Sequence, residues 1–243
     1  MQHDRRRPVG RPAGRASLTS GDVARAALAA VERGGLDGLS MRRVADDLGV
    51  QAASLYWHVQ SKDHLLDLVA EELFSMLELP QPSADADWRA GLRGLSIAYY
   101  QFLLDHRDAD RIVAGRFALS AHFVRHLETF AGLLRRGGLA DNDAAYALYA
   151  IIVYIQGFVL HQRSPLTGDS AAGAAASEVL AQIRDRLLAL PADQFPATKA
   201  LAESLTRPDI GGRFLFGLDL LLNGLAPLSG KTPQSPTEAG LPG

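Results

Sequence analysis

Apolar residues recur every three or four positions along most of the chain, which is the spacing of amphipathic helices. The N-terminal third predicts three helices, each bounded by polar caps or glycine, and the start of a fourth. They run from Thr19 or Ser20 to Gly34, from Ser40 to Gly49, over Gln51–His58, and onward from Ser61. Gly49 suits a left-handed C-cap, so the second and third helices are joined by a tight turn.

Beyond Pro80 the same helical spacing continues to residue 225. It predicts helices near 88–106, 119–136, 142–162, 177–190, 197–206 and 208–225. Residues 164–176 form a polar, glycine-containing and alanine-rich connection, which we expect to be mobile. No run of alternating apolar and polar residues predicts a strand, so the fold class is all-α.

Two short helices joined by a glycine turn, after a first helix, are typical of a helix-turn-helix. Leu55 and Val59 are four residues apart and can pack inward. The ring residues Tyr56, Trp57 and His58 are consecutive, so they splay over most of the circumference of the third helix. On a recognition helix they can donate hydrogen bonds to phosphates or base edges. The alternative is an aromatic patch that packs on another domain.

The distribution of charge favours DNA as the partner of the N-terminal end. Residues 1–62 carry ten lysines and arginines against six acidic residues, whereas the remainder carries fifteen against twenty-one. Residues 1–18 hold five of those arginines, two prolines and two glycines, and read as a flexible basic arm. Its "GRPAGR" segment either enters the minor groove of the DNA or only adds non-specific affinity for DNA.

Composition excludes several classes of protein and site. The chain has 243 residues and no cysteine, which rules out disulfides, thiolate zinc sites and cysteine nucleophiles. No apolar run reaches the length of a membrane span, and no apolar segment follows the basic N-terminus as in a signal peptide, so we expect a cytoplasmic protein. His122 and His126 share a helix face, but no third metal ligand is evident. No phosphate-loop, dinucleotide or nucleophile-elbow motif is present, so no cofactor is expected.

The segment "GLSMRRVADDLGVQAASLYWHVQSKDHLLDLV" resembles the N-terminal signature of the tetracycline-repressor (TetR) family of bacterial regulators. "LLDHRDADRIVAG", "AYALYAIIVYIQGFVL" and "FLFGLDLLLNGL" resemble the ligand-binding half of its tetracycline-binding branch. The resemblance covers about residues 20–225. It implies a three-helix head, a larger helical ligand-binding domain, and a homodimer through the helices near 142–162 and 208–225. Both helices are apolar nearly all round, which supports this interface independently.

The resemblance also implies which residues contact operator DNA. They are Arg42, Tyr56, Trp57, His58 and Lys62, with Ser54 and Met41 as lesser members. The sequence departs from tetracycline-binding members at Ala52 and Ala53, where those have glutamine and proline. Alanine cannot read a base by a hydrogen bond, so we expect a different operator.

The implied ligand site departs further from that branch. Tetracycline-binding members hold a magnesium chelate with a histidine that aligns with Val113 and a glutamate that aligns with His161. Other polar drug contacts align with Leu95 and Phe130. We therefore expect a hydrophobic or aromatic inducer and no metal. The pocket candidates are Leu95, Tyr99, Val113, Arg116, Phe117, Leu127, Phe130 and His161. Arg116 either pairs with an inducer carboxylate or phenolate, or is solvated.

These observations predict a basic arm (1–18), a helix-turn-helix head (19–62), a ligand-binding and dimerisation domain (63–226) and a disordered tail (227–243). The expected function is a DNA-binding regulator, a repressor that a small molecule releases from a palindromic operator. The alternative is a helical carrier or enzyme with an accessory DNA-binding head. The complete head and the lack of a catalytic constellation favour the regulator.

Overall fold

The structure is a computed structural model that describes residues 18–83, 85, 87–114, 116, 120–163 and 173–228, with backbone alone at 173–176. Its helices are α1 (Ser20–Gly34), η1 (Leu36–Gly38), α2 (Met41–Leu48), α3 (Ala52–Leu55), α4 (Lys62–Met76), α5 (Trp88–Asp105), α6 (Ala109–Val113), α7 (Ala121–Arg136), α8 (Asp141–Gln162), α9 (Gly173–Leu188), α10 (Pro196–Ala200), α11 (Ala202–Leu205), α12 (Ile210–Leu225) and η2 (Ala226–Leu228). These ranges contain no strand, and the all-α class is confirmed. Most of the predicted arm, connection and tail (1–17, 164–172 and 229–243) lies outside them.

The chain divides into two compact units between Glu72 and Leu73. The sequence predicts that the head ends ten residues earlier, at the start of α4. The difference arises because Leu65 and Val69, in the first half of α4, are fully buried and belong to the first unit. Helix α4 therefore begins in the first unit and ends in the second.

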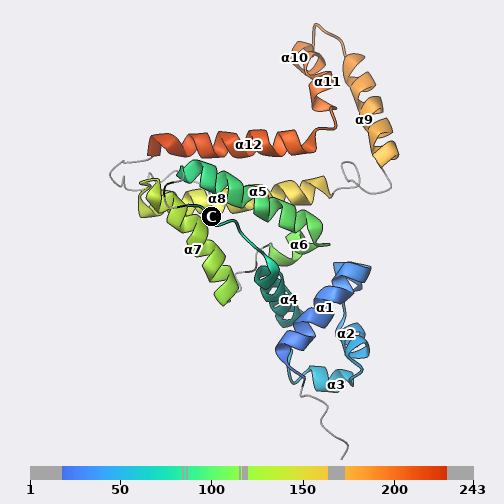
Figure 1. Cartoon of the computed structure of the whole chain (residues 1–243). Helices are drawn as coiled ribbons and strands as arrows, with labels where there is room; N and C mark the ends of the chain where they lie inside the picture. Colours follow the sequence, from blue (N-terminus) through green and yellow to red (C-terminus); the bar gives the residue numbers. More distant parts are fainter. Residues whose placement is uncertain are drawn as a thin grey trace, which may run out of the picture. The chain divides into compact units, whose positions relative to one another are not determined.

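The first unit contains α1, η1, α2, α3 and most of α4 (Figure 1). Thr19 caps α1 in a capping box with Asp22, whose backbone N–H donates to the Thr19 hydroxyl. The hydroxyl of Thr19 donates to the Asp22 carboxylate in return, and this bond is the main reason why the pKa of Asp22 is lowered. The core includes small and β-branched residues of α1 and α2, together with Leu55, Val59 and the buried residues of α4.

Helix α3 is shorter than predicted, because it ends at Leu55 and not at His58. The backbone N–H groups of His58 and Val59 both donate to the carbonyl of Leu55, at 2.9 Å each. The chain thus closes into a turn around this carbonyl, and the three ring residues lie in the turn. Leu55 and Val59 are fully buried on either side of it, as their spacing predicts.

In the second unit, α5, α7, α8 and α12 pack against one another (Figure 1). Helix α5 contacts the other three, and its residues Leu92, Leu95 and Leu103 are completely buried. Phe214 of α12 stacks on Tyr100 of α5, with ring centroids 3.8 Å apart. A separate set of contacts joins α9 to α10 and α11.

Several boundaries in this unit differ from the sequence prediction for local reasons. Helix α7 begins at Ala121, because the Ser120 hydroxyl accepts the backbone N–H of Phe123 as an N-cap. Helix α9 begins at Gly173, inside the connection (164–176) that the sequence predicts to be mobile. The helix expected over 197–206 is two short helices, and α6 was not predicted at all. Five residues are too few to show a helical period.

Helix α8 is long and apolar enough to cross a membrane by length and composition alone. Its residues Ala147, Ile151, Ile155 and Val159 are nevertheless buried within the second unit. Gln156, in the second half of the helix, bonds a side chain of α5. One face of α8 thus packs within the bundle, and we keep the prediction that this helix does not span a membrane.

Candidate functional site

The first unit exposes an aromatic surface at the turn after α3. Trp57 is 89% exposed and Tyr56 is 54% exposed, while His58 is half-buried. Large aromatic side chains are seldom left so exposed on a protein surface without a partner. We call Tyr56, Trp57 and His58 the aromatic surface.

The backbone before this surface has the geometry of a helix-turn-helix. The Ser40 hydroxyl accepts the N–H of Arg43 and caps α2. Gly49 follows α2 with φ 65° and ψ 32°, a left-handed conformation that favours glycine. The N–H of Val50 then bonds the carbonyl of Ala45, which closes the helix end. After this turn, Leu55 of α3 is buried in the core, whereas Tyr56 and Trp57 are exposed.

The other residues predicted to contact DNA lie on the surface of the same unit. Arg42 on α2, Ser54 on α3 and Lys62 at the start of α4 are exposed, and Met41 is half-buried. All of these side chains except that of Met41 carry hydrogen-bond donors, and phosphate oxygens only accept. The unit therefore presents donors of the type that a DNA backbone requires.

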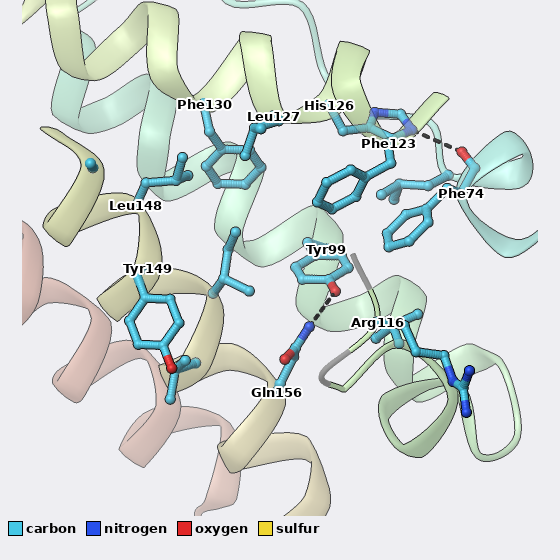
Figure 2. Close-up of a pocket in the computed structure, with 15 residues that line it drawn as sticks. Phe74, Tyr99, Arg116, Phe123, His126, Leu127, Phe130, Leu148, Tyr149 and Gln156 are labelled. Atoms are coloured by element: carbon cyan, nitrogen blue, oxygen red, sulfur yellow. Dashed lines mark hydrogen bonds between the residues drawn. The ribbon is translucent and has the colours of Figure 1, made fainter. Parts of the chain in front are cut away.

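The second unit contains a cavity of about 380 Å³ (Figure 2). Its walls come from the end of α4 and from α5, α6, α7, α8 and the segment after α6. The lining residues are Phe74, Leu77, Tyr99, Val113, Arg116, Phe123, His126, Leu127, Phe130, Ala145, Leu148, Tyr149, Ile152, Val153 and Gln156. A volume of this order accommodates an organic molecule of several rings.

The structure places five of the residues predicted from sequence in this lining. They are Tyr99, Val113, Arg116, Leu127 and Phe130. Leu95 is fully buried in the helix packing, and His161 is exposed near the end of α8, so neither belongs to the lining. Phe117 lies outside the described residues.

Most of the residues that α8 contributes to the cavity were not predicted from the sequence. Ala145, Leu148, Ile152 and Gln156 line it with the helical spacing of three and four residues. This spacing was visible in the sequence. It was not informative there, because α8 is apolar nearly all round and any of its faces could have been the lining.

Two polar contacts lie among the aromatic rings of the lining. Gln156 Nε2 donates to the Tyr99 hydroxyl oxygen at 3.0 Å. Burial is the main reason why the pKa of Tyr99 is raised to about 12, so the phenol is neutral at physiological pH. His126 Nε2 lies 2.8 Å from the carbonyl oxygen of Phe74, and Figure 2 shows this contact beside the Phe123 ring. A carbonyl only accepts, so His126 carries a hydrogen on Nε2.

The Phe74–His126 contact connects α7 to the last turn of α4. The final four carbonyls of a helix have no partner within it, and His126 provides one for Phe74. His126 is one of the two histidines considered above as metal ligands, and this bond engages one of its ring nitrogens. Within the described residues, no group of three His, Asp or Glu side chains is placed to hold a metal ion.

A buried ion pair fixes α6, which carries Val113. Asp110 is almost completely buried, and its Oδ1 lies 3.1 Å from Nε of Arg163. Arg163 also donates from Nη2 to the carbonyls of Leu103 and His106 at the end of α5. Burial raises the pKa of Asp110, and the charge of Arg163 opposes this shift. Arg163 thus joins the ends of α5 and α8 to α6.

Comparison with known families gives matches to both units. Residues 23–69 match the model described as bacterial regulatory proteins, tetR family, and residues 79–228 match the tetracyclin repressor-like C-terminal domain. Tetracycline repressor protein class A from transposon 1721 of Escherichia coli is 35% identical over 216 residues, which cover 86% of this chain and 91% of that protein. The transcriptional repressor DrrR1 of Streptomyces coeruleorubidus is 31% identical and covers 90% of this chain and 81% of its own length.

Solved structures agree in fold over most of the chain. The TetR family protein ActR of Streptomyces coelicolor in complex with actinorhodin has a TM-score of 0.80 and 34% identity, and covers 89% of this chain and 99% of its own. The complex of ActR with (S)-DNPA has a TM-score of 0.75 and 34% identity, and covers 86% of this chain and 98% of its own.

Proposed function

The chain belongs to the tetracycline-repressor family of bacterial regulators, and from this premise we propose which of its surfaces binds operator DNA and which binds the inducer. The protein is a ligand-responsive DNA-binding transcriptional repressor. Models of regulator families match both halves of the chain, and this disfavours the alternative of a carrier or an enzyme. As a DNA-binding repressor it acts in the cytoplasm of a bacterium.

The operator is bound by the aromatic surface together with Arg42, Ser54 and Lys62. The observation that carries this proposal is Trp57, which is 89% exposed directly after a helix-turn-helix. Exposed donors on three consecutive elements can contact phosphates and fix the register of the head on the duplex. Ala53 is exposed on α3, where its methyl group can pack on a thymine methyl.

Replacing Lys62 by alanine tests the electrostatic part of this surface. Affinity for operator and for random DNA should fall together, and the slope of log affinity against log salt should flatten by about one unit, as the loss of one phosphate contact predicts. Fluorescence anisotropy with a labelled duplex at several salt concentrations measures both. Lys199, which donates to the carbonyl of Leu190, provides a matched control at which alanine should leave the slope unchanged. An unchanged slope for Lys62→Ala would place Lys62 away from the phosphates.

The protein acts as a homodimer through α8 and α12. Both helices carry large apolar side chains that the single chain leaves exposed. They are Tyr146, Tyr149, Val153 and Leu160 on α8, and Phe216 and Leu220 on α12. An exposed apolar face of this size indicates a protein interface, and dimers are typical of the family. Two heads related by a twofold axis match a palindromic operator.

The inducer occupies the cavity of the second unit and is an aromatic, mainly apolar molecule. Five of the lining residues carry phenylalanine or tyrosine rings, and all five are labelled in Figure 2 (Phe74, Tyr99, Phe123, Phe130, Tyr149). Burial of apolar area stabilises a complex by roughly 25 cal/mol per Å², so such a ligand needs few polar contacts. ActR, which shares the fold, has been solved with actinorhodin and with (S)-DNPA.

The residues of this chain do not fit the magnesium chelate of tetracycline-binding relatives. Val113, which aligns with their histidine ligand, is a buried valine in the lining and has no donor atom for a hard cation. His161, which aligns with their glutamate, is exposed and does not line the cavity. We therefore expect ligand binding to be independent of metal.

Helix α4 provides the route from the cavity to the head. Its residue Phe74 lines the cavity and bonds His126, while its first residue is Lys62, one of the proposed phosphate contacts. A ligand that prefers a shifted position of α4 therefore disfavours DNA binding. A preference of about 3 kcal/mol changes the balance between the two states more than a hundredfold.

A further inference from the structure

The side chains of Tyr99 on α5 and Gln156 on α8 point toward each other in the wall of the cavity (Figure 2). Tyr99 is only 6% exposed, and Gln156 Nε2 donates to its hydroxyl oxygen at 3.0 Å. Both residues line the cavity, and their surroundings in the lining are mostly rings and aliphatic side chains. The pair is therefore a fixed polar site in an apolar cavity.

The pair has a hydrogen-bond donor to spare. The Gln156 amide donates one hydrogen to Tyr99, so the hydrogen of the tyrosine hydroxyl is not used in this bond. If the amide were turned round, Tyr99 would donate to it and both amide hydrogens of Gln156 would be left. In either arrangement the pair can offer a donor to a molecule in the cavity.

We propose that Tyr99 and Gln156 determine the ligand specificity of the cavity by selecting aromatic molecules that carry a carbonyl oxygen. The proposal rests on the assignment of the cavity as the inducer site. A carbonyl oxygen accepts the spare donor, whereas a hydrocarbon of the same shape leaves the donor buried without an acceptor. The acceptor of the ligand then lies against the wall formed by α5 and α8.

Other polar groups of the lining are placed less well for this role. His126 Nε2 is engaged by the carbonyl of Phe74 at 2.8 Å. Figure 2 shows the guanidinium of Arg116 directed away from Tyr99 and Gln156. The remaining lining residues are apolar apart from the hydroxyl of Tyr149, whose side chain is largely exposed. The strongest discrimination is therefore expected at the Tyr99–Gln156 pair.

The donor persists over the whole physiological range of pH. Burial raises the pKa of Tyr99 to about 12, and the charge of Asp110 acts in the same direction. The phenol is thus neutral below that pH and keeps its hydrogen. The amide of Gln156 does not titrate. The selectivity for a carbonyl should accordingly be the same at pH 6 and pH 9.

The test compares 9-fluorenone with fluorene, two rigid aromatic molecules of nearly equal size that differ in one carbonyl group. Binding of each to the full-length protein, without DNA, is measured by isothermal titration calorimetry. We expect 9-fluorenone to bind about five- to tenfold more tightly, the range of one buried hydrogen bond. Equal affinities, or no binding of either compound, would overturn the proposal.

Substitutions test whether Tyr99 and Gln156 cause the preference for 9-fluorenone over fluorene. Tyr99→Phe or Gln156→Leu alone should reduce the preference, because a donor remains in each, and the double variant should abolish it. Ile152→Val, another residue of the lining, should change both affinities equally and leave their ratio intact. A loss of packing alone would also act on both compounds, so the ratio separates the two effects. A double variant with an unchanged ratio would contradict the proposal.

Failure of this proposal and failure of the proposed regulatory function give different results when ligand binding and release from DNA are both measured. A protein that prefers 9-fluorenone but is not released from DNA by any ligand would retain the specificity assignment and lose the regulatory one. A protein that a ligand releases from its operator, but that binds both compounds equally, would retain the regulatory function alone.

Discussion

Replacing Phe216 and Leu220 together by arginine is expected to give a monomer that binds operator at least about a hundredfold more weakly than the native protein. The two residues are four apart on α12, and they are 68% and 59% exposed in the single chain. In the proposed dimer both become buried. Two arginines without partners in an apolar interface cost far more than the contacts they replace.

The effect on DNA follows from the loss of the second head. A dimer binds its second half-site as an intramolecular event, which raises affinity by about 10²–10⁴. Light scattering coupled to size exclusion reports the oligomeric state, and a gel-shift titration reports the affinity. Val124→Arg is the matched control, because Val124 is 46% exposed on α7, outside the proposed interface. A dimeric double variant would show that α12 does not form the interface.

Replacing Tyr56 and Trp57 together by alanine is expected to weaken operator binding about 30- to 900-fold with little effect on stability. Trp57 is 89% exposed, and substitutions at such positions usually change the free energy of unfolding by less than about 0.5 kcal/mol. Each aromatic side chain is expected to contribute about 1–2 kcal/mol of contact with the duplex, in the range of other specific DNA contacts.

Anisotropy titration gives the affinity of this variant, and a thermal melt gives its stability. Phe195→Ala removes a comparable ring, 44% exposed, from the segment before α10 and should leave DNA binding unchanged. Native affinity in the double variant would contradict the DNA-binding role of the aromatic surface and favour the alternative that it packs on another domain.

The sequence predicted the head well because its signals are local. Thr19, Ser40 and Gly49 act within a few residues of their own positions, and the structure confirms each as a cap. The end of α3 was wrong by three residues. Whether the helix continues past Leu55 depends on how the backbone closes around the carbonyl of this residue. The pattern of apolar and polar side chains does not predict that closure.

The cavity could be predicted only in part, because its walls come from residues far apart in the chain. The resemblance to tetracycline-binding members suggested Val113 and Phe130, which line it, and also Leu95 and His161, which do not. The bond between Tyr99 and Gln156 joins positions 57 residues apart. Such pairs arise from the packing of α5 on α8. The residues next to Tyr99 in the sequence give no indication that Gln156 is its partner.

Metal-independent induction is tested most directly by release of the full-length protein from an operator that has been selected from random duplexes by binding. Fraction bound is followed by anisotropy while ligand is added, with magnesium present and again with a chelator. We predict that tetracycline with magnesium leaves the complex intact, and that within a panel of polycyclic aromatic ketones at least one releases the protein equally well in both conditions. Release by tetracycline that the chelator abolishes would contradict the account, because it would require a metal site where the structure has Val113.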